Sequence, residues 1–197
     1  MTDVTQTGGA IFEMLRSRKS SRAFATTPVE TDKIHRLLEA ARWAPSARNN
    51  QPWRFVVAPR EQTDVFEGIV STLLPHNAGW AANAALFIVV VVNTAWDADG
   101  SPNPYASYDT GGSVAHLTVQ AIAEGLTLRQ IGTFYSDSLR EVIALPDTFK
   151  PITLLAVGYP GEVTSLPEEY RSLETAPRTR KPLRELAFQG KWGEPLK

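Results

Sequence analysis

A run of nine consecutive apolar residues, Ala84 to Val92, constrains the fold of this chain more than any other feature of its sequence. The run ends in four valines and is about half as long as a membrane-spanning helix, which needs roughly 20 apolar residues. It is rich in β-branched residues, uninterrupted, and too short for most helices. We therefore expect a strand that is buried on both faces of a central sheet.

Helical periodicity appears on both sides of this strand. Apolar residues from Ile34 to Ala41 recur at i, i+3, i+4 and i+7, which predicts a helix over residues 31–43. Similar patterns predict helices at 62–74 and 107–124, the second ending at Gly125. The remaining expected elements are short: helices near 11–15 and 138–144, strands at 53–57 and 152–159, and a segment at 128–132. Helices and strands alternate irregularly, so we expect an α+β fold with a mixed sheet.

The length of 197 residues fits one domain, and the last forty residues, which have little periodicity, predict an extended arm. Lys and Arg number 20 against 21 Asp and Glu, so the chain lacks the basic excess of a nucleic-acid or anionic-membrane binder. No cysteine is present, which excludes thiol chemistry; any redox work needs a bound cofactor. Met1–Ala10 is polar, without a signal-peptide core, which predicts a cytoplasmic protein.

Several common functional motifs are missing. The sequence contains neither the G-x-G-x-x-G dinucleotide fingerprint nor the P-loop, and it lacks the G-x-S-x-G nucleophile elbow. Its three histidines, His35, His76 and His116, lie far apart without metal-ligand spacing. We therefore expect no metal site and assign no side chain as a general acid, general base or nucleophile.

Two cationic clusters stand out in a chain that is otherwise balanced in charge. The first is Arg-Ser-Arg-Lys-Ser-Ser-Arg at residues 16–22, and the second is Arg-Thr-Arg-Lys at residues 178–181. Arginine forks bind phosphate oxygens bidentately and a serine hydroxyl adds a donor, which suits a phosphate monoester. The alternative is a solvated helix end whose cations face the negative pole of the helix dipole.

A polar loop bounded by Pro45 and Pro52 carries three amides, a hydroxyl and a guanidinium. Amide side chains offer a donor and an acceptor together, which suits the edge of a heteroaromatic ring with alternating carbonyls and ring nitrogens. The alternative is a polar turn in which asparagine and glutamine bond their own backbone.

Together these segments resemble the nitroreductase family of FMN-dependent oxidoreductases. The resemblance rests on an R-x-S-x-R-x-F element at residues 18–24, followed after one helix by A-P-S-x-x-N-x-Q-P-W at residues 44–53. Further similarity extends over most of the chain, at Tyr108–Asp109 and at residues 125–134, 156–160 and 180–183. The resemblance implies homodimers of α+β subunits with FMN at the subunit interface.

The resemblance also assigns residues to the cofactor. Four residues of the first cluster would hold the ribityl phosphate and the pyrimidine edge of the flavin: Arg18, Lys19, Ser20 and Arg22. Two from the second cluster would reach the same phosphate: Arg178 and Arg180. Two would lie near the ribityl chain and ring: Asn49 and Gln51. Three would pack on the flavin of the other subunit: Pro45, Ser46 and Ala47. Three would present backbone groups near the reactive nitrogen: Gln130, Ile131 and Gly132. Asn77 would contact the pyrimidine edge.

Three positions depart from the pattern that the resemblance implies. A lysine often found one turn after the Asn77 position is Trp80 here, so Arg22 is expected to do more to stabilise negative charge on the flavin. Gln130 stands where an apolar residue is usual, and Thr133 where a small one is usual. Both changes alter the expected pocket above the ring, so the substrate preference is not determined by the resemblance.

The activity implied is hydride transfer from NAD(P)H to a nitroaromatic or quinone acceptor by a ping-pong mechanism, with the chemistry carried by FMN. Alternative enzymatic interpretations retain the same fold with a different reaction: flavin destructase, reductive dehalogenase or oxidase. A non-catalytic reading is an FMN-storage or sensor protein, or a module that binds another anion. The helix at 107–124 is apolar on several sides, which favours either a homodimer or complete burial within one subunit.

Overall fold

The computed structural model describes residues 11–196. Their central feature is a sheet of four strands in the order β1-β2-β4-β3. These are β1 (Trp53–Pro59), β2 (Leu86–Asn93), β3 (Thr127–Ile131) and β4 (Phe149–Gly158). The expectation for the polar segment Met1–Ala10 falls outside the described residues.

The apolar run forms β2, with every residue from Leu86 to Val92 buried. Because successive side chains of a strand point to opposite faces, Phe87, Val89 and Val91 enter one hydrophobic cluster. Leu86, Ile88 and Val90 enter a second cluster across the sheet. The prediction of a strand buried on both faces is confirmed.

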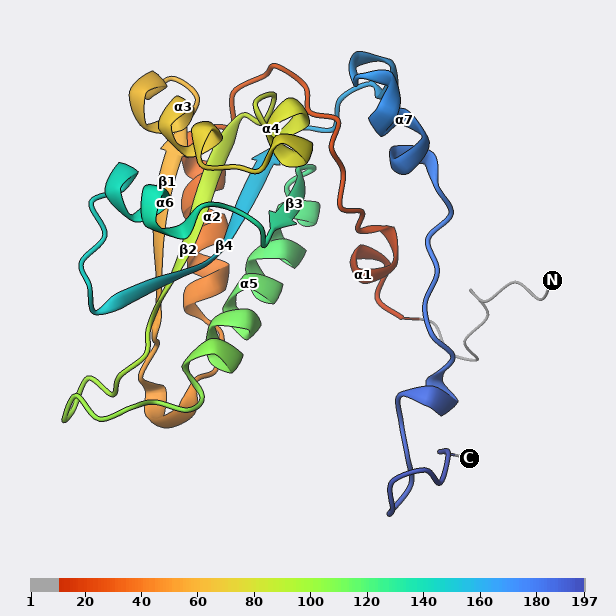
Figure 1. The fold of residues 1–197 in the computed structure, drawn as a ribbon. Helices are drawn as coiled ribbons and strands as arrows, with labels where there is room; N and C mark the ends of the chain where they lie inside the picture. Colours follow the sequence, from red (N-terminus) through yellow and green to blue (C-terminus); the bar gives the residue numbers. More distant parts are fainter. Residues whose placement is uncertain (1–10, 197) are drawn as a thin grey trace.

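Helices cover each face of the sheet (Figure 1). The first cluster is covered by α3 (Thr63–Ser71), α4 (Pro75–Ala81) and α6 (Ser136–Val142). The second is covered by α2 (Thr31–Arg42) and α5 (Ala106–Ala123), which pack side by side. Gly125 follows α5 with a φ of +73°, as expected of a helix-ending glycine. The α+β class is confirmed.

The sheet corrects one expectation, because all three strand pairs among the described residues are antiparallel rather than mixed. The connection through α5 brings β3 parallel to β2, but the two strands are not neighbours. Instead β4 lies between them and runs in the opposite direction. The crossover therefore creates no parallel hydrogen-bonded pair.

Three further expectations need correction. The helix predicted at 62–74 ends at Ser71, and Pro75 starts the separate helix α4, because proline fits the first helical turn, where its missing N–H is not needed. The C-terminal arm is not wholly extended, since it contains α7 (Glu168–Thr175) and a short 3-10 turn at Leu183–Glu185. Helix α1 (Glu13–Ser17) lies two residues later than expected.

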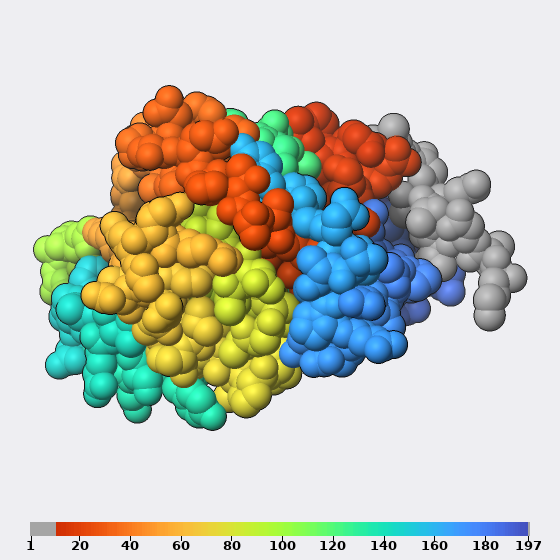
Figure 2. All heavy atoms as spheres, turned by 90° about the horizontal axis from the view of Figure 1, so that it is seen from above, coloured from red at the N-terminus to blue at the C-terminus, as the bar shows by residue number. Residues whose placement is uncertain are grey.

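The first and last segments of the described residues, 11–25 and 160–196, run along the same side of the molecule (Figures 1 and 2). An isolated bridge joins Phe24 to Pro160. The amide of Gly161 donates to the carbonyl of Ala23 at 3.0 Å, and that of Ala25 donates to the carbonyl of Tyr159 at 2.9 Å. The segment after α1 is thereby attached to the segment that follows β4. Within residues 11–196, none of the helices has the length and apolarity needed to cross a membrane.

Candidate functional site

The two cationic segments of the sequence meet in space. A guanidinium nitrogen of Arg178 donates to the backbone carbonyl of Arg18 at 2.6 Å, although 160 positions separate the two residues. Arg18 in turn donates from Nη1 to the hydroxyl of Ser20 at 3.0 Å. Burial lowers the pKa of Arg18, and the positive charges of Arg180 and Arg178 lower it further. We call Arg18, Arg178 and Arg180 the basic cluster.

The basic cluster lacks an internal counter-charge. None of the ion pairs formed among residues 11–196 includes Arg18, Arg178 or Arg180. Helix α1 spans five residues, too few for a substantial dipole to account for three arginines. Clustered guanidinium groups with a serine hydroxyl form a suitable receptor for a doubly charged phosphate. This observation favours the anion-binding interpretation of the sequence over a solvated helix end.

A cavity of about 310 Å³ brings together several other predicted residues. Five of the residues expected from the sequence line it: Arg22, Asn77, Gln130, Ile131 and Gly132. Thr133, which was expected from the sequence to alter this pocket, also lines it. Further lining residues were not predicted: His76, Arg129, Tyr170 and Leu173. Asn77 donates from Nδ2 to the Thr133 hydroxyl at 3.0 Å, which connects α4 to the segment after β3. The cavity thus brings together two arginines, an asparagine and the segment at residues 130–133.

Sequence reasoning missed the part of the site that α7 provides. One carboxylate oxygen of Glu174 accepts a hydrogen bond from the hydroxyl of Ser21, and the other accepts one from the backbone amide of Arg22 at 2.9 Å. The carboxylate therefore holds the segment that connects the basic cluster to the cavity. Pro167 followed by two glutamates was the available signal, because this pattern is typical of a helix N-terminus.

Arg129 was also missed, although it lies on β3 and lines the cavity. Its guanidinium lies over the indole ring of Trp80, 5.4 Å from the ring centroid, and donates to the carbonyl of Ser20 at 2.6 Å. Trp80 is fully buried and fills the place where the resemblance implies a lysine. An isolated arginine in a strand carries no sequence signal of such a role.

The polar loop at residues 45–51 lies elsewhere. In Figure 1 it connects α2 to β1 at the lower end of the sheet, whereas α4 lies at the upper end. The structure of one chain therefore does not bring this loop to the cavity. Five of the predicted residues lie in this loop and therefore away from the cavity: Pro45, Ser46, Ala47, Asn49 and Gln51. Lys19 is exposed beside the basic cluster.

The loop is held by its own polar groups. The amide of Gln51 donates to the Ser46 hydroxyl at 3.0 Å, and its side chain donates to the Asn49 side-chain oxygen at 3.1 Å. The amide of Ala47 donates to Asp109 of α5 at 2.9 Å. Arg48, Asn49 and Gln51 all have positive φ angles, a strained conformation that is concentrated at functional sites. Internal bonding thus accounts for part of the loop's polar composition.

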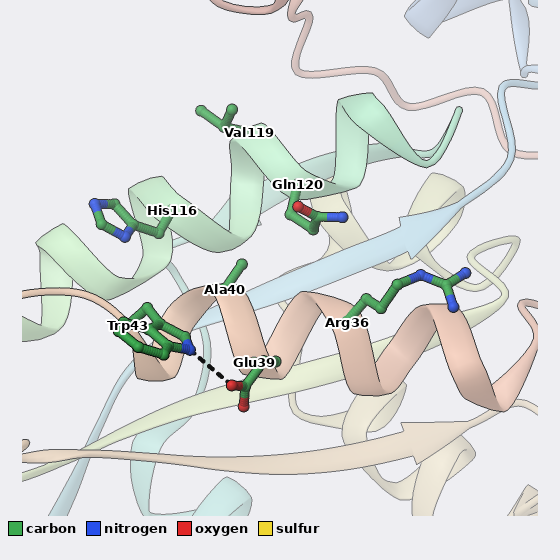
Figure 3. A pocket seen from close by; sticks show the side chains of 7 residues that line it. All are labelled: Arg36, Glu39, Ala40, Trp43, His116, Val119 and Gln120. Atoms are coloured by element: carbon green, nitrogen blue, oxygen red, sulfur yellow. Dashed lines mark hydrogen bonds between the residues drawn. The ribbon is translucent and has the colours of Figure 1, made fainter.

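A larger hollow, of about 520 Å³, lies between α2 and α5 (Figure 3). It is open to solvent and contains none of the predicted cofactor residues. Its lining comprises Arg36, Glu39, Ala40, Trp43, His116, Val119 and Gln120. Trp43 is 72% exposed and donates from its indole to Glu39 at 2.7 Å.

Within the described part of the chain, no group of three or more His, Asp or Glu side chains could hold a metal ion.

Comparison with known proteins adds an independent observation. The family model described as "Nitroreductase family" matches residues 15–159. The chain belongs to the nitroreductase family. This nitroreductase-family chain superposes on the crystal structure of an oxidoreductase containing FMN with a TM-score of 0.89. The two are 31% identical, and the match covers 98% of this chain and 100% of the other.

Curated relatives of this nitroreductase-family chain differ in their names. A proposed NADH dehydrogenase/NAD(P)H nitroreductase of Archaeoglobus fulgidus is 26% identical over 75% of this chain and 84% of its own length. The iodotyrosine deiodinase of Haliscomenobacter hydrossis is 24% identical over 84% of this chain and 86% of its own length. The family identification is thus firm, whereas the names of relatives cover more than one reaction.

Proposed function

We propose that this chain is an FMN-dependent oxidoreductase that transfers hydride from NAD(P)H to a small oxidised acceptor, such as a nitroaromatic or a quinone. The observation that carries the proposal is the meeting of the two cationic segments beside the cavity that Arg22 and Asn77 line. Family membership and the FMN-containing structural neighbour support it. In this proposal, residues 1–197 form one FMN-binding domain.

The chemical groups present fit FMN. The basic cluster and the Ser20 hydroxyl would hold the ribityl phosphate, because they offer several donors and no internal counter-charge. Asn77 and Arg22 would bind the polar pyrimidine edge, since the cavity exposes an amide and a guanidinium. The backbone of residues 130–132 would face the reactive part of the ring.

When bound, FMN supplies the two-electron transfer between donor and acceptor. The chain's own contribution is to bind the phosphate, orient the ring and present positive charge to it. Glu174 serves this arrangement indirectly, because it fixes the backbone at Ser21 and Arg22. No side chain of the chain is required to move a proton in this scheme.

We further propose that the active unit is a homodimer with FMN between the subunits. Helix α5 buries Val114, Leu117 and Ala121 in its own subunit but leaves Tyr108 83% exposed and Ala115 exposed. The separation of residues 45–51 from the cavity also favours a second subunit, which could supply that loop. NAD(P)H as the donor implies a cytoplasmic location.

The dimer predicts an effect of a charge on the outward face of α5. The substitution Ala115→Glu would place a carboxylate at the proposed subunit contact, and we expect it to convert a dimer into a monomer in sedimentation velocity. Glu67→Arg, on the exposed surface of α3, is the matched control and should leave the dimer intact. A wild-type monomer, or a dimer that persists in the Ala115 variant, would contradict this assembly.

The reaction is tested by the visible spectrum of the purified protein reconstituted with FMN. We expect anaerobic NADH or NADPH to bleach the flavin absorbance, and subsequent addition of a nitroaromatic or quinone to restore it. Flavin that stays oxidised with both donors would contradict the reductase and favour storage or sensing. A protein that takes up no FMN would contradict the cofactor assignment itself.

Reductive dehalogenation is a second candidate, favoured by the similarity to the iodotyrosine deiodinase over most of both chains. It retains the same cofactor site and differs in the acceptor, which would be an aryl halide. Release of iodide from an iodinated phenol by the reduced protein, without comparable turnover of nitroaromatics, would favour this candidate.

A further inference from the structure

Two arginine side chains, Arg22 and Arg129, line the same cavity. None of the ion pairs among residues 11–196 includes either of them. Burial lowers the pKa of Arg129, and the charge of Arg22 lowers it further, while Glu174 acts in the opposite direction. Two like charges in one partly enclosed space repel each other, and a negatively charged ligand between them offsets that repulsion.

The position of Arg129 is defined by its surroundings. Its guanidinium lies over the ring of Trp80, an arrangement in which the aromatic face attracts the cation. Trp80 is itself fixed, because it is fully buried and donates from its indole to the carbonyl of His76 at 3.1 Å. A cation held in this way needs little reorganisation when a ligand arrives.

Arg129 also retains donors for a ligand. A guanidinium has five N–H donors. Within the described residues, its one hydrogen bond goes to the carbonyl of Ser20. That bond connects β3 to the segment between Arg18 and Arg22. The side chain therefore faces the cavity with charge and with unused donors, which distinguishes it from a purely structural arginine.

We propose that Arg129 is a cofactor-binding residue that, together with Arg22, favours the reduced form of bound FMN because that form carries more negative charge. The proposal rests on the FMN site described above and extends it to a residue outside the sequence motifs. It assigns the charge of this cavity to two segments that lie far apart in sequence, the stretch around Arg22 and strand β3. The hydrogen bond from Arg129 to the Ser20 carbonyl joins these segments, and the Trp80 ring packs against Arg129.

The test compares three variants with the wild type: Arg129→Gln, Arg129→Lys and Lys150→Gln. Lys150 is an exposed residue near the start of β4, away from the cavity, and controls for the loss of one positive charge. The measurements are the dissociation constant of oxidised FMN, from titration of the apoprotein, and the two-electron midpoint potential of bound FMN, from spectroelectrochemistry.

We expect Arg129→Gln to weaken the preference for reduced over oxidised FMN about tenfold, which lowers the midpoint potential by about 30 mV for a two-electron couple. Arg129→Lys should retain most of the wild-type potential, because it retains the charge. Lys150→Gln should match the wild type. A purely structural role would weaken both redox forms equally and leave the potential unchanged.

Three results would overturn the inference. If the wild type binds FMN and Arg129→Gln has the wild-type potential, or if Arg129→Lys shifts it as far as Arg129→Gln does, the charge of Arg129 has no such role. If the wild type binds no FMN, the proposed cofactor site fails and this inference fails with it.

Discussion

Replacing Arg18 with alanine is expected to weaken FMN binding roughly 30- to 150-fold, because a hydrogen bond to a charged group contributes about 2–3 kcal/mol. Arg18 occupies the centre of the basic cluster: Arg178 donates to its carbonyl, and its own side chain donates to Ser20. The substitution removes the partly buried guanidinium but leaves the backbone carbonyl available to Arg178. Titration of the apoprotein with FMN, followed by quenching of flavin fluorescence, measures the effect.

Riboflavin provides the decisive comparison because it lacks the phosphate. If Arg18 binds the phosphate, Arg18→Ala should leave riboflavin affinity close to that of the wild type while FMN affinity falls. Lys150→Ala, which removes an exposed cation elsewhere, should leave the affinity for both ligands unchanged. Equal losses for FMN and riboflavin would indicate that Arg18 supports the fold of the segment and does not bind the phosphate.

Replacing Gly161 with alanine is expected to destabilise the folded chain by about 3 kcal/mol or more, because inserting atoms into a closely packed contact forces the backbone to move. A Cβ at this position would lie 2.5 Å from the carbonyl carbon and 2.6 Å from the carbonyl oxygen of Phe24. The same residue donates from its amide to the carbonyl of Ala23 at 3.0 Å, so the strain would also affect that bond. Urea denaturation of the apoprotein measures the change.

The matched control is Gly132→Ala, since a Cβ there would meet nothing within 4 Å. In the apoprotein this variant should have a stability within about 1 kcal/mol of the wild type. Wild-type stability in Gly161→Ala would show that the segments around Phe24 and Pro160 are not held as closely as the structure describes.

The sheet and its two covering layers could be predicted because local sequence determines them. The apolar run at 84–92 can form little other than a buried strand, and α2 and α5 follow clear helical periodicity. The break before Pro75 was less evident, because apolar residues continue through it. The direction of strand pairing was not available either, because it depends on which strand inserts between β2 and β3.

Site residues could be predicted where they lie in recognisable sequence segments, and not where their role depends on contacts made by folding. The cationic clusters and residues 130–132 lie in or beside segments similar to the family, and the resemblance also assigns Asn77. The structure brings the two clusters together and places Asn77 and residues 130–132 around one cavity. Glu174 and Arg129 act through contacts with Ser21, Ser20 and Trp80 that exist only after folding. No spacing in the sequence connects these partners. The position of loop 45–51 at the end of the sheet opposite α4 is likewise set by the fold and not by local sequence.

The attachment of Glu174 to the backbone of Arg22 has a thermodynamic consequence. The basic cluster and this carboxylate belong to the two ends of the chain, whereas the hydrophobic clusters belong to the sheet and its helices. Ligand binding stabilises the part of a protein that the ligand orders, and regions of one protein can open with different free energies. Bound FMN should therefore protect the amides of residues 18–25 and 168–180 from hydrogen exchange far more than those of β2. Loss of the cofactor and unfolding of the sheet would then be separate transitions.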